Sequence, residues 1–188
     1  MSRRAVLAPL LLIVATLLAG GIAAADPTRY RIQPEASEAR FRATSRLMDA
    51  DGKFSRLAGE VTVDPKDPAT AKISVTIEAA SIDTGIGMRD NHLRSADFLD
   101  VARFPTIKFE SQRVEVTGKK AAVTGQLTLH GVAREIVVPV EVQFSDVALI
   151  ATGEFVLNRR DYAINYSSVL NPIGDSVRIT FTFRARAS

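Results

Sequence analysis

The polar residues with the clearest chemical potential lie together in one short stretch, at Arg89, Asp90 and His92. A guanidinium, a carboxylate and an imidazole this close in sequence could hold the polar end of a ligand or act as acid–base groups. They could equally form an Arg–Asp pair on a solvated helix face, with His92 capping or packing against that helix. The second histidine, His130, precedes Gly131 and is expected to be a turn residue that hydrogen-bonds the backbone.

Other catalytic and metal-binding patterns are weak or absent. The chain has two histidines, no cysteine, no H-x-x-x-H motif and no close carboxylate cluster, so we expect no metal site. It contains no G-x-S-x-G elbow and no serine with an evident histidine base. Asp49 and Asp51 adjoin Gly52 and are expected to form a turn. We therefore predict no enzymatic activity and no cofactor. The enzymatic alternative is a lipid isomerase or hydrolase that uses Arg89, Asp90 and His92, which we call the polar trio, as acid–base groups.

The stretch that carries the trio, residues 81–111, interrupts the pattern of the rest of the chain. Ser95 is suited to be a helix N-cap because its hydroxyl can accept from a backbone N–H two or three residues on. Pro105 ends any helical continuation. The expected elements are a turn over residues 83–87, helical turns over 88–94 and 96–100, and a strand over 106–112.

Outside this stretch, apolar and polar residues alternate with period two. Such alternation is typical of strands with one face on a core and the other in water. Pro139 lies within one of these segments and is expected to mark an edge, a bulge or a local opening. No long amphipathic helix separates the segments, so we predict an all-β fold of eight to ten antiparallel strands. The segments are 38–44, 60–63, 72–78, 114–116, 123–129, 136–144, 155–157, 162–166 and 177–184.

The first 25 residues are typical of a secretory signal peptide. Arg3 and Arg4 precede an apolar run, and Ala23 to Ala25 provide small residues for cleavage after Ala25. The mature chain would be one domain over residues 26–188, with 22 basic and 21 acidic residues. This balance gives no electrostatic reason to expect nucleic-acid binding. We predict that the protein is exported to the periplasm, where a chain without cysteine is held by packing alone.

The strand pattern alone leaves a barrel and a sandwich open. A barrel of about eight strands can be filled by side chains or hold one small ligand. Small residues on the apolar faces, at Ala39, Ala43, Gly125 and Ala163, would leave room inside. Nine phenylalanines, three tyrosines and no tryptophan would line such a space without an obvious plug.

Two longer motifs bear on this choice. The first contains D-T-G at 83–85, R-D-x-H-L at 89–93, Ser95, D-F at 97–98, F-P at 104–105, Phe109 and Ser111; the second is G-Q-L-T-L-H-G-V at 125–132. In this order and spacing, and with an opening strand at 38–44 followed by G-E-V at 59–61, they resemble the YceI-like family of bacterial periplasmic proteins. Many members carry histidines where this chain reads E-A-S at 35–37 and T-S-R at 44–46, so those histidines have no counterpart here.

The resemblance implies a lipocalin-like antiparallel β-barrel of about eight strands, with the helical segment across the barrel or near its mouth. It implies an apolar cavity that holds an isoprenoid quinone or a polyprenyl chain, for transport, storage or stress response. It also implies a homodimer, and transient contact with membrane components would fit such a ligand. The alternatives are a carrier of a fatty acid or fatty amide and a stress-related scaffold without catalytic activity.

Thirteen apolar residues are expected to line this cavity, although each could also be ordinary core. They are Phe41, Val75, Ile77, Phe98, Ile107, Phe109, Leu127, Leu129, Val138, Val140, Phe155, Ile179 and Phe181. We assign the polar end of the ligand site to Arg89, Asp90 and His92.

Overall fold

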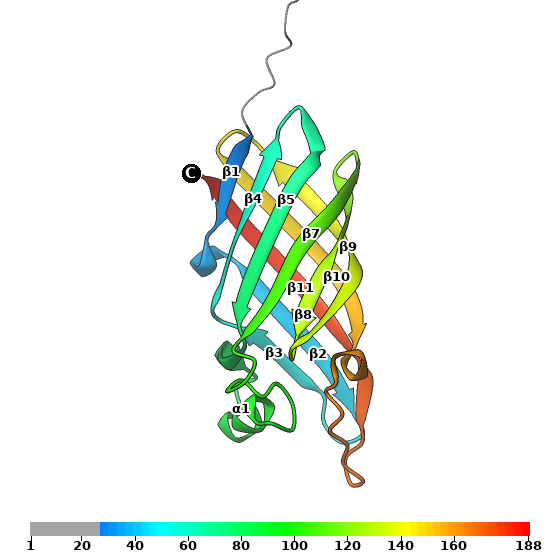
Figure 1. Ribbon diagram of the computed structural model, residues 1–188. Helices are drawn as coiled ribbons and strands as arrows, with labels where there is room; N and C mark the ends of the chain where they lie inside the picture. The colour runs from blue at the N-terminus through cyan, green and yellow to red at the C-terminus, as the bar shows by residue number, and fades with distance from the viewer. Residues whose placement is uncertain (1–26) are drawn as a thin grey trace, which may run out of the picture.

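The computed structural model describes residues 27–188, and the predicted signal peptide lies outside the described residues. Eleven strands account for most of this part of the chain (Figure 1). They are β1 (Thr28–Ile32), β2 (Glu38–Ser45), β3 (Ala50–Phe54), β4 (Leu57–Asp64), β5 (Asp67–Glu78), β6 (Ile82–Asp83), β7 (Thr106–Thr117), β8 (Lys120–Leu129), β9 (Val132–Phe144), β10 (Ala148–Asn158) and β11 (Ile173–Ala187). The helical elements are α1 (Gly87–Arg94) and the 3-10 turns η1 (Pro34–Ala36), η2 (Ala79–Ser81) and η3 (Arg159–Tyr162).

Eight of the strands close into an antiparallel barrel. Their order is β1, β4, β5, β7, β8, β9, β10 and β11, and β11 pairs back to β1. The long strand β11 meets β1 only over Ala185–Ala187, whereas over Ile173–Thr182 it pairs with β2, from which β3 and β6 extend the sheet. The predicted lipocalin-like antiparallel barrel is therefore confirmed.

The two ends of the barrel differ. Helix α1 lies beyond one end, which we call the helix end (Figure 1). The β4–β5 and β7–β8 turns and the C-terminus lie at the other, which we call the hairpin end. Strand β11 runs between them with Val177, Ile179 and Phe181 facing inward, while Arg178 is exposed on the outside. This is the period-two pattern that its sequence predicts.

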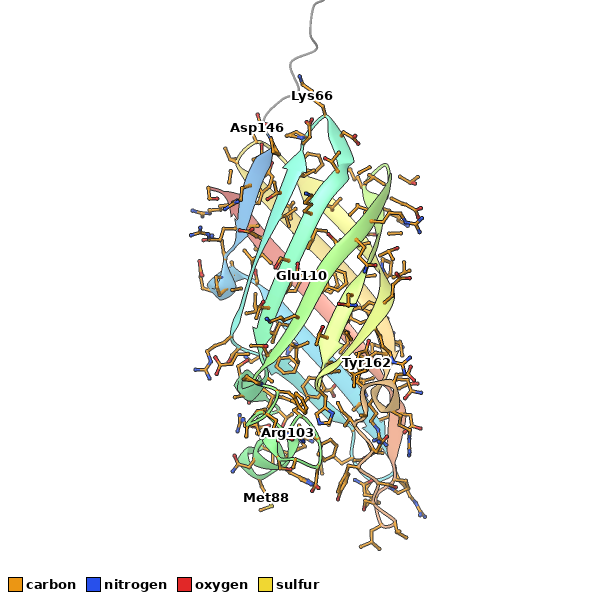
Figure 2. All side chains as sticks on the ribbon, viewed as in Figure 1. Lys66, Met88, Arg103, Glu110, Asp146 and Tyr162 are labelled. Atoms are coloured by element: carbon orange, nitrogen blue, oxygen red, sulfur yellow. The ribbon has the colours of Figure 1, made fainter. Side chains whose placement is uncertain are left out.

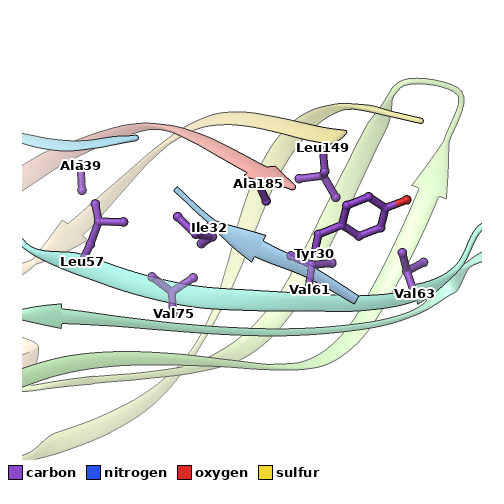
Figure 3. Close-up of a cluster of buried hydrophobic side chains, with 9 residues drawn as sticks. All are labelled: Tyr30, Ile32, Ala39, Leu57, Val61, Val63, Val75, Leu149 and Ala185. Atoms are coloured by element: carbon purple, nitrogen blue, oxygen red, sulfur yellow. The ribbon is translucent and has the colours of Figure 1, made fainter. Parts of the chain in front are cut away.

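Part of the interior is ordinary packed core. Tyr30 is fully buried on β1, and its hydroxyl donates a hydrogen bond to the Ser145 carbonyl at 2.8 Å. Eight other apolar side chains pack around it where β1 closes the barrel (Figure 3). The side chains in Figure 3 come mainly from β1, β4, β10 and β11, and six of the nine also line a cavity inside the barrel.

Three sequence-based expectations are wrong in detail. Residues 162–166 are not a strand, because the Asn158 side chain accepts from the Arg160 N–H and starts the turn η3. Ala163 ends that turn in a left-handed conformation, with φ of 58°. It is exposed and lines neither cavity, so its small side chain does not create space inside the barrel. Asp51 is a strand residue of β3, and the chain turns just before it, at 46–49.

The expected second helical turn is also absent from the described segment. Residues 96–100 form successive turns, and Ser95 is the C-cap of α1 rather than the start of a new helix. The Ser95 hydroxyl donates to the His92 carbonyl at 2.7 Å and accepts from the Asp97 N–H at 3.3 Å. The hydroxyl thus makes the predicted forward contact, but the residues that follow form a turn that ends at left-handed Asp100, with φ of 43°.

Two local expectations are confirmed. His130 and Gly131 both have positive φ and form the turn between β8 and β9, and His130 Nδ1 lies 3.0 Å from the Tyr162 carbonyl oxygen. Pro139 marks a local opening: β9 pairs with β8 over Val132–Glu141, but with β10 only over Val140–Phe144. A residue without an N–H is tolerated where the ladder stops.

Candidate functional site

The segment after β6 is held by a buried carboxylate. Asp90 is almost fully buried, and its Oδ1 accepts from the Thr84 N–H at 2.8 Å and from the Thr84 hydroxyl at 2.5 Å. Arg89 donates from Nε to the same hydroxyl at 2.9 Å and from Nη2 to the Thr84 carbonyl at 3.1 Å. Both side chains therefore fix the start of α1 against the preceding turn. Gly85, at φ of 74°, takes the left-handed position in that turn.

His92 joins two segments that are distant in sequence. Its Nε2 lies 3.0 Å from Asp97 Oδ2, within its own segment. Its ring packs edge-on against Phe98, with centroids 5.0 Å apart, and against Tyr166, at 4.9 Å. Phe98 and Tyr166 also contact each other, at 4.7 Å. These three rings connect residues 87–101 with residues 163–172. Both segments lie over the helix end of the barrel, and together we call them the cover (Figure 2).

Two apolar cavities occupy the barrel. The helix-end cavity has a volume of about 180 Å³, and the cover closes it with Leu93, Phe98, Leu99 and Ile164. Its other lining residues are Ala39, Arg40, Phe41, Ala43, Phe54, Ile77, Ile82, Ile107, Leu127, Leu129, Phe155, Leu157, Arg159, Ile173, Val177 and Ile179.

The hairpin-end cavity has a similar volume, about 180 Å³, and every one of its lining residues is apolar. It extends from the middle of the barrel to Pro68, Val116 and Phe144, near the hairpin turns. Its remaining lining residues come from all eight barrel strands and from β2; they are Ile32, Ala39, Val61, Val63, Ala71, Ile73, Val75, Ile77, Phe109, Val114, Ala121, Val123, Leu127, Ile136, Val138, Val140, Val142, Leu149, Ala151, Phe155, Ile179, Phe181 and Phe183.

Five residues line both cavities and form a ring between them, which we call the collar. They come from five strands, β2, β5, β8, β10 and β11, and are Ala39, Ile77, Leu127, Phe155 and Ile179. The two cavities are thus neighbouring compartments of one barrel interior. A flexible apolar chain that passed the collar would have access to both.

The structure places the predicted site residues in two groups. All thirteen apolar residues line at least one cavity: Val75, Phe109, Val138, Val140 and Phe181 the hairpin-end one, Phe41, Phe98, Ile107 and Leu129 the helix-end one, and the remaining four, Ile77, Leu127, Phe155 and Ile179, both. Arg89, Asp90 and His92 line neither cavity and bond within or beside the cover. Their contact with a ligand head group stays a prediction.

Two of the lining phenylalanines lie over a glycine that is directly opposite on a neighbouring strand. Phe41 is directly opposite Gly52, and a Cβ at Gly52 would lie 2.5 Å from the Phe41 ring. Phe181 is directly opposite Gly153, where a Cβ would lie 2.4 Å from the Phe181 ring. Because each ring occupies the space above a glycine, it lies along the wall instead of projecting across the cavity.

Arg159 is a site residue that sequence reasoning missed. Its side chain is buried at the helix-end cavity, and its guanidinium donates to the carbonyls of Ile164, Ile173 and Gly174 at 2.7 to 3.3 Å. Its Nη2 also lies 2.9 Å from Asp175 Oδ1. Hydrogen bonding from Arg160, with the charges of Arg160 and Arg159, holds the pKa of Asp175 below its ordinary value. No local sequence motif marks this role, because all its partners depend on the folded loop.

Within residues 27–188, no group of three or more acidic, histidine or cysteine side chains is arranged to hold a metal ion. Over the same residues, no helix has the length and hydrophobicity required to cross a bilayer.

Comparison with known proteins identifies the family. The family model of the YceI-like domain matches residues 30–185, which is nearly all of the described chain. The chain belongs to the YceI-like family. A relative named UPF0312 protein, from Pseudomonas aeruginosa (strain LESB58), is 39% identical to this YceI-like chain over 135 residues, covering 70% of this chain and 69% of the relative. Protein YceI of Escherichia coli O157:H7 is 45% identical over 85 residues, covering 45% of this chain and 44% of that protein.

Solved structures share the YceI-like fold. BcnA of Burkholderia cenocepacia superposes with a TM-score of 0.76 at 24% identity, over 81% of this chain and 98% of its own. A structure described as a polyisoprenoid binding domain from Saccharophagus degradans has a TM-score of 0.67 at 19% identity, over 85% of this chain and 98% of its own. At these identities the likeness concerns the fold alone.

Proposed function

We propose that this protein binds a polyisoprenoid-type lipid, an isoprenoid quinone or a polyprenyl chain, inside the barrel. The observation that carries the proposal is the pair of apolar cavities that meet at the collar. The description of the Saccharophagus degradans structure as a polyisoprenoid binding domain supports the same ligand class. Family membership adds to this support because the match extends over residues 30–185, which contribute all the lining.

The chemistry of the lining favours a hydrocarbon chain. Of all the residues lining the two cavities, only Arg40 and Arg159 are polar. The Arg159 guanidinium is already engaged by three carbonyls and Asp175. Each methylene-sized group that leaves water contributes roughly 0.8 kcal/mol, before the entropic costs of binding are subtracted. A branched apolar chain therefore gains affinity at every step, whereas a polar group in the interior would lack partners.

We propose that the segment carrying Arg89, Asp90 and His92 serves binding rather than catalysis. Asp90 is committed to Thr84, and His92 to Asp97 and two aromatic rings. The protein would then carry, store or buffer its lipid in the periplasm after export, without a cofactor and as a homodimer. A fatty acid or fatty amide is the second candidate ligand, because the lining does not distinguish a straight chain from a branched one.

The decisive experiment is to express the full precursor and purify the mature protein from the periplasm. Native and then denaturing mass spectrometry would show whether an added mass accompanies the protein and extracts into organic solvent. A mass in the series of isoprenoid quinones or polyprenols supports the proposal, and a fatty acid or amide mass supports the second candidate. No added mass, together with no uptake of offered quinones or polyprenols, would leave the scaffold role. The native spectrum also gives the oligomeric state.

The same material tests the polar trio. If a head group contacts His92, the His92→Ala protein should keep the apolar chain but lose preference between ligands that differ only in the head group. Incubating the extracted lipid with the parent and with Asp90→Asn and His92→Ala tests catalysis, since conversion by the parent alone would favour the enzymatic alternative.

A further inference from the structure

We propose that the helix end of the barrel is a docking surface for the surface of an anionic phospholipid bilayer. The proposal concerns where the protein meets a membrane, and it does not depend on which lipid occupies the cavities. It is carried by exposed apolar side chains, by the charge around them and by their continuity with the helix-end cavity.

Exposed apolar side chains gather on three segments at this end. Within the described residues, ten large hydrophobic side chains are exposed, and six of them belong to these segments. Met88 is 85% exposed, Val169 95% and Leu170 84%. The other three are Leu47, Met48 and Ile86. Isolated exposed hydrophobics are common on soluble proteins, but a cluster at one end indicates an interaction surface.

Contacts between the segments hold the cluster together. The Leu47 N–H donates to Asn171 Oδ1 at 3.0 Å, and the Arg46 N–H donates to the Pro172 carbonyl at 3.1 Å. Arg89 Nη1 lies 3.9 Å from Met48 Sδ, which joins the first segment to the start of α1. Figure 2 shows Met88 at the tip of the molecule, at the end opposite Lys66 and Asp146. We call residues 45–48, 84–89 and 165–172 the docking tips.

The charge of the docking tips fits phosphate head groups. Their sequences contain two arginines, Arg46 and Arg89, and no aspartate or glutamate. Of the adjoining carboxylates, Asp49 pairs with Arg42 and Asp90 is buried against Thr84, while Asp83 directly precedes the same turn. The Arg89 guanidinium is held by Thr84 and the Asp49 carbonyl, so Arg46 is the cation of the tips that faces water. Arg46 is exposed, and among the described residues its guanidinium forms no ion pair. Apolar side chains that enter the interface and a basic side chain beside them that meets anionic head groups are the two features that bind peripheral proteins to a membrane. A hydrated, purely anionic partner surface would match the positive charge but not the exposed apolar side chains.

The docking tips are continuous with the lining of the helix-end cavity. The first tip follows Ala43, and the third is flanked by Ile164 and Ile173; all three residues line that cavity. The second tip leads into Leu93 and Phe98, which close the cavity from the cover. A bilayer that received the tips would therefore face the cover and the helix-end cavity beneath it.

Flotation with vesicles tests the proposal. The mature protein is mixed with vesicles of phosphatidylethanolamine and phosphatidylglycerol, and the fraction that floats is measured over a range of lipid concentrations. The variant Met88→Ser/Val169→Ser/Leu170→Ser should bind at least about tenfold more weakly, because three apolar side chains no longer leave water on docking. The matched control Val137→Ser/Val147→Ser/Val156→Ser removes exposed valines elsewhere on the surface and should bind as the parent does.

Charge gives a second, independent readout. Arg46→Ser should lower binding to these vesicles about fivefold and should change binding to phosphatidylcholine vesicles far less. The proposal is overturned if the parent does not float, or if both triple variants lose binding equally. It is also overturned if the tip variant instead dissociates a dimer in analytical ultracentrifugation while vesicle binding is absent, because the face would then join two copies of the chain. Lipid found in the cavities with no flotation would leave the proposed function standing and reject only the docking surface.

Discussion

Phe155 and Ile179 lie directly opposite each other on β10 and β11, and each side chain lines both cavities. On its other edge β11 pairs with β2, where Ala39 lies opposite Phe181. Phe155, Ile179 and Ala39 are three of the five collar residues. Ala39 is the smallest member of this ring. The boundary between the two compartments thus includes one position where the side chain is only a methyl group.

Enlarging Ala39 should shorten the bound chain. In Ala39→Leu, the added carbons fill the space between the compartments, and a chain can occupy only one of them. We expect the co-purified lipid to shift toward shorter species, or a long-chain ligand to be lost, as measured by native mass spectrometry. Ala151→Leu adds the same volume to the wall of the hairpin-end cavity alone and should leave the distribution of chain lengths nearly unchanged. Equal effects in both variants would show that total volume, not the collar, limits the ligand.

A methyl group at Gly52 should narrow the helix-end cavity. The new Cβ of Gly52→Ala would lie 2.5 Å from the Phe41 ring and 2.9 Å from Thr84 Cγ2, so both side chains must move. Phe41 has its free space toward the cavity, and we expect weaker uptake of a fluorescent polyprenyl probe. Overpacking of this kind typically costs about 1–3 kcal/mol of unfolding free energy as well. Gly87→Ala is the control, because a Cβ at Gly87 meets nothing within 4 Å and Gly87 has no positive φ.

Removal of the Asp90 carboxylate should loosen the start of α1. Asp90→Ala leaves the Thr84 N–H and hydroxyl without their acceptor, and we expect a loss of about 2–3 kcal/mol in unfolding free energy measured with urea. Asp90→Asn keeps one acceptor oxygen and should lose less. Hydrogen exchange should speed up at Thr84 and through α1 while the β8 and β9 amides remain protected. Uniformly faster exchange would contradict a local role for this carboxylate.

The fold could be predicted from the sequence because alternation is a local signal. In β11, inward Ile179 and outward Arg178 report the two faces of one strand, and neighbouring strands repeat the pattern. Alternation mispredicts the structure where local hydrogen bonds and left-handed residues fix a turn. Residues 162–166 alternate like a strand, yet the Asn158 cap and left-handed Ala163 make them a turn. The short strands β3 and β6 carry too little apolar pattern to be recognised.

The lining could be predicted for the same reason, since inward positions of a barrel are those that face a cavity. The polar half of the site could not. Arg89 and Asp90 are adjacent in sequence, but their partners Thr84 and the Asp49 carbonyl are fixed only by how the turn folds back. Arg159 was missed because its carbonyl partners lie on a loop whose path no residue pattern specifies.

Loss of the Tyr166 ring should loosen the cover. Tyr166 contacts His92 and Phe98, so Tyr166→Ala removes the aromatic link between the two halves of the cover. We expect faster release of a bound fluorescent lipid, with the equilibrium capacity unchanged, in a stopped-flow experiment with acceptor vesicles. Val147→Ala, which shortens an exposed side chain at the hairpin end and away from the docking tips, serves as the control for the release rate. An unchanged release rate in Tyr166→Ala would mean that the chain leaves by another path, such as the hairpin end.

The buried hydroxyl of Tyr162 should limit stability at alkaline pH. In the described part of the chain it is the one buried side-chain polar atom without a hydrogen-bond partner, and burial raises its pKa above the ordinary value of 10.0. A raised folded-state pKa means that the stability associated with the neutral phenol is complete below pH 10.0 and is lost as the pH rises toward the folded-state pKa. Tyr162→Phe should therefore equal the parent or exceed it by up to about 1 kcal/mol at neutral pH. It should also lose less unfolding free energy than the parent between about pH 9 and 11, as measured by urea titration at each pH. Greater destabilisation of the variant at neutral pH would show instead that the hydroxyl has a partner in solution, for which a bound water is the simplest candidate.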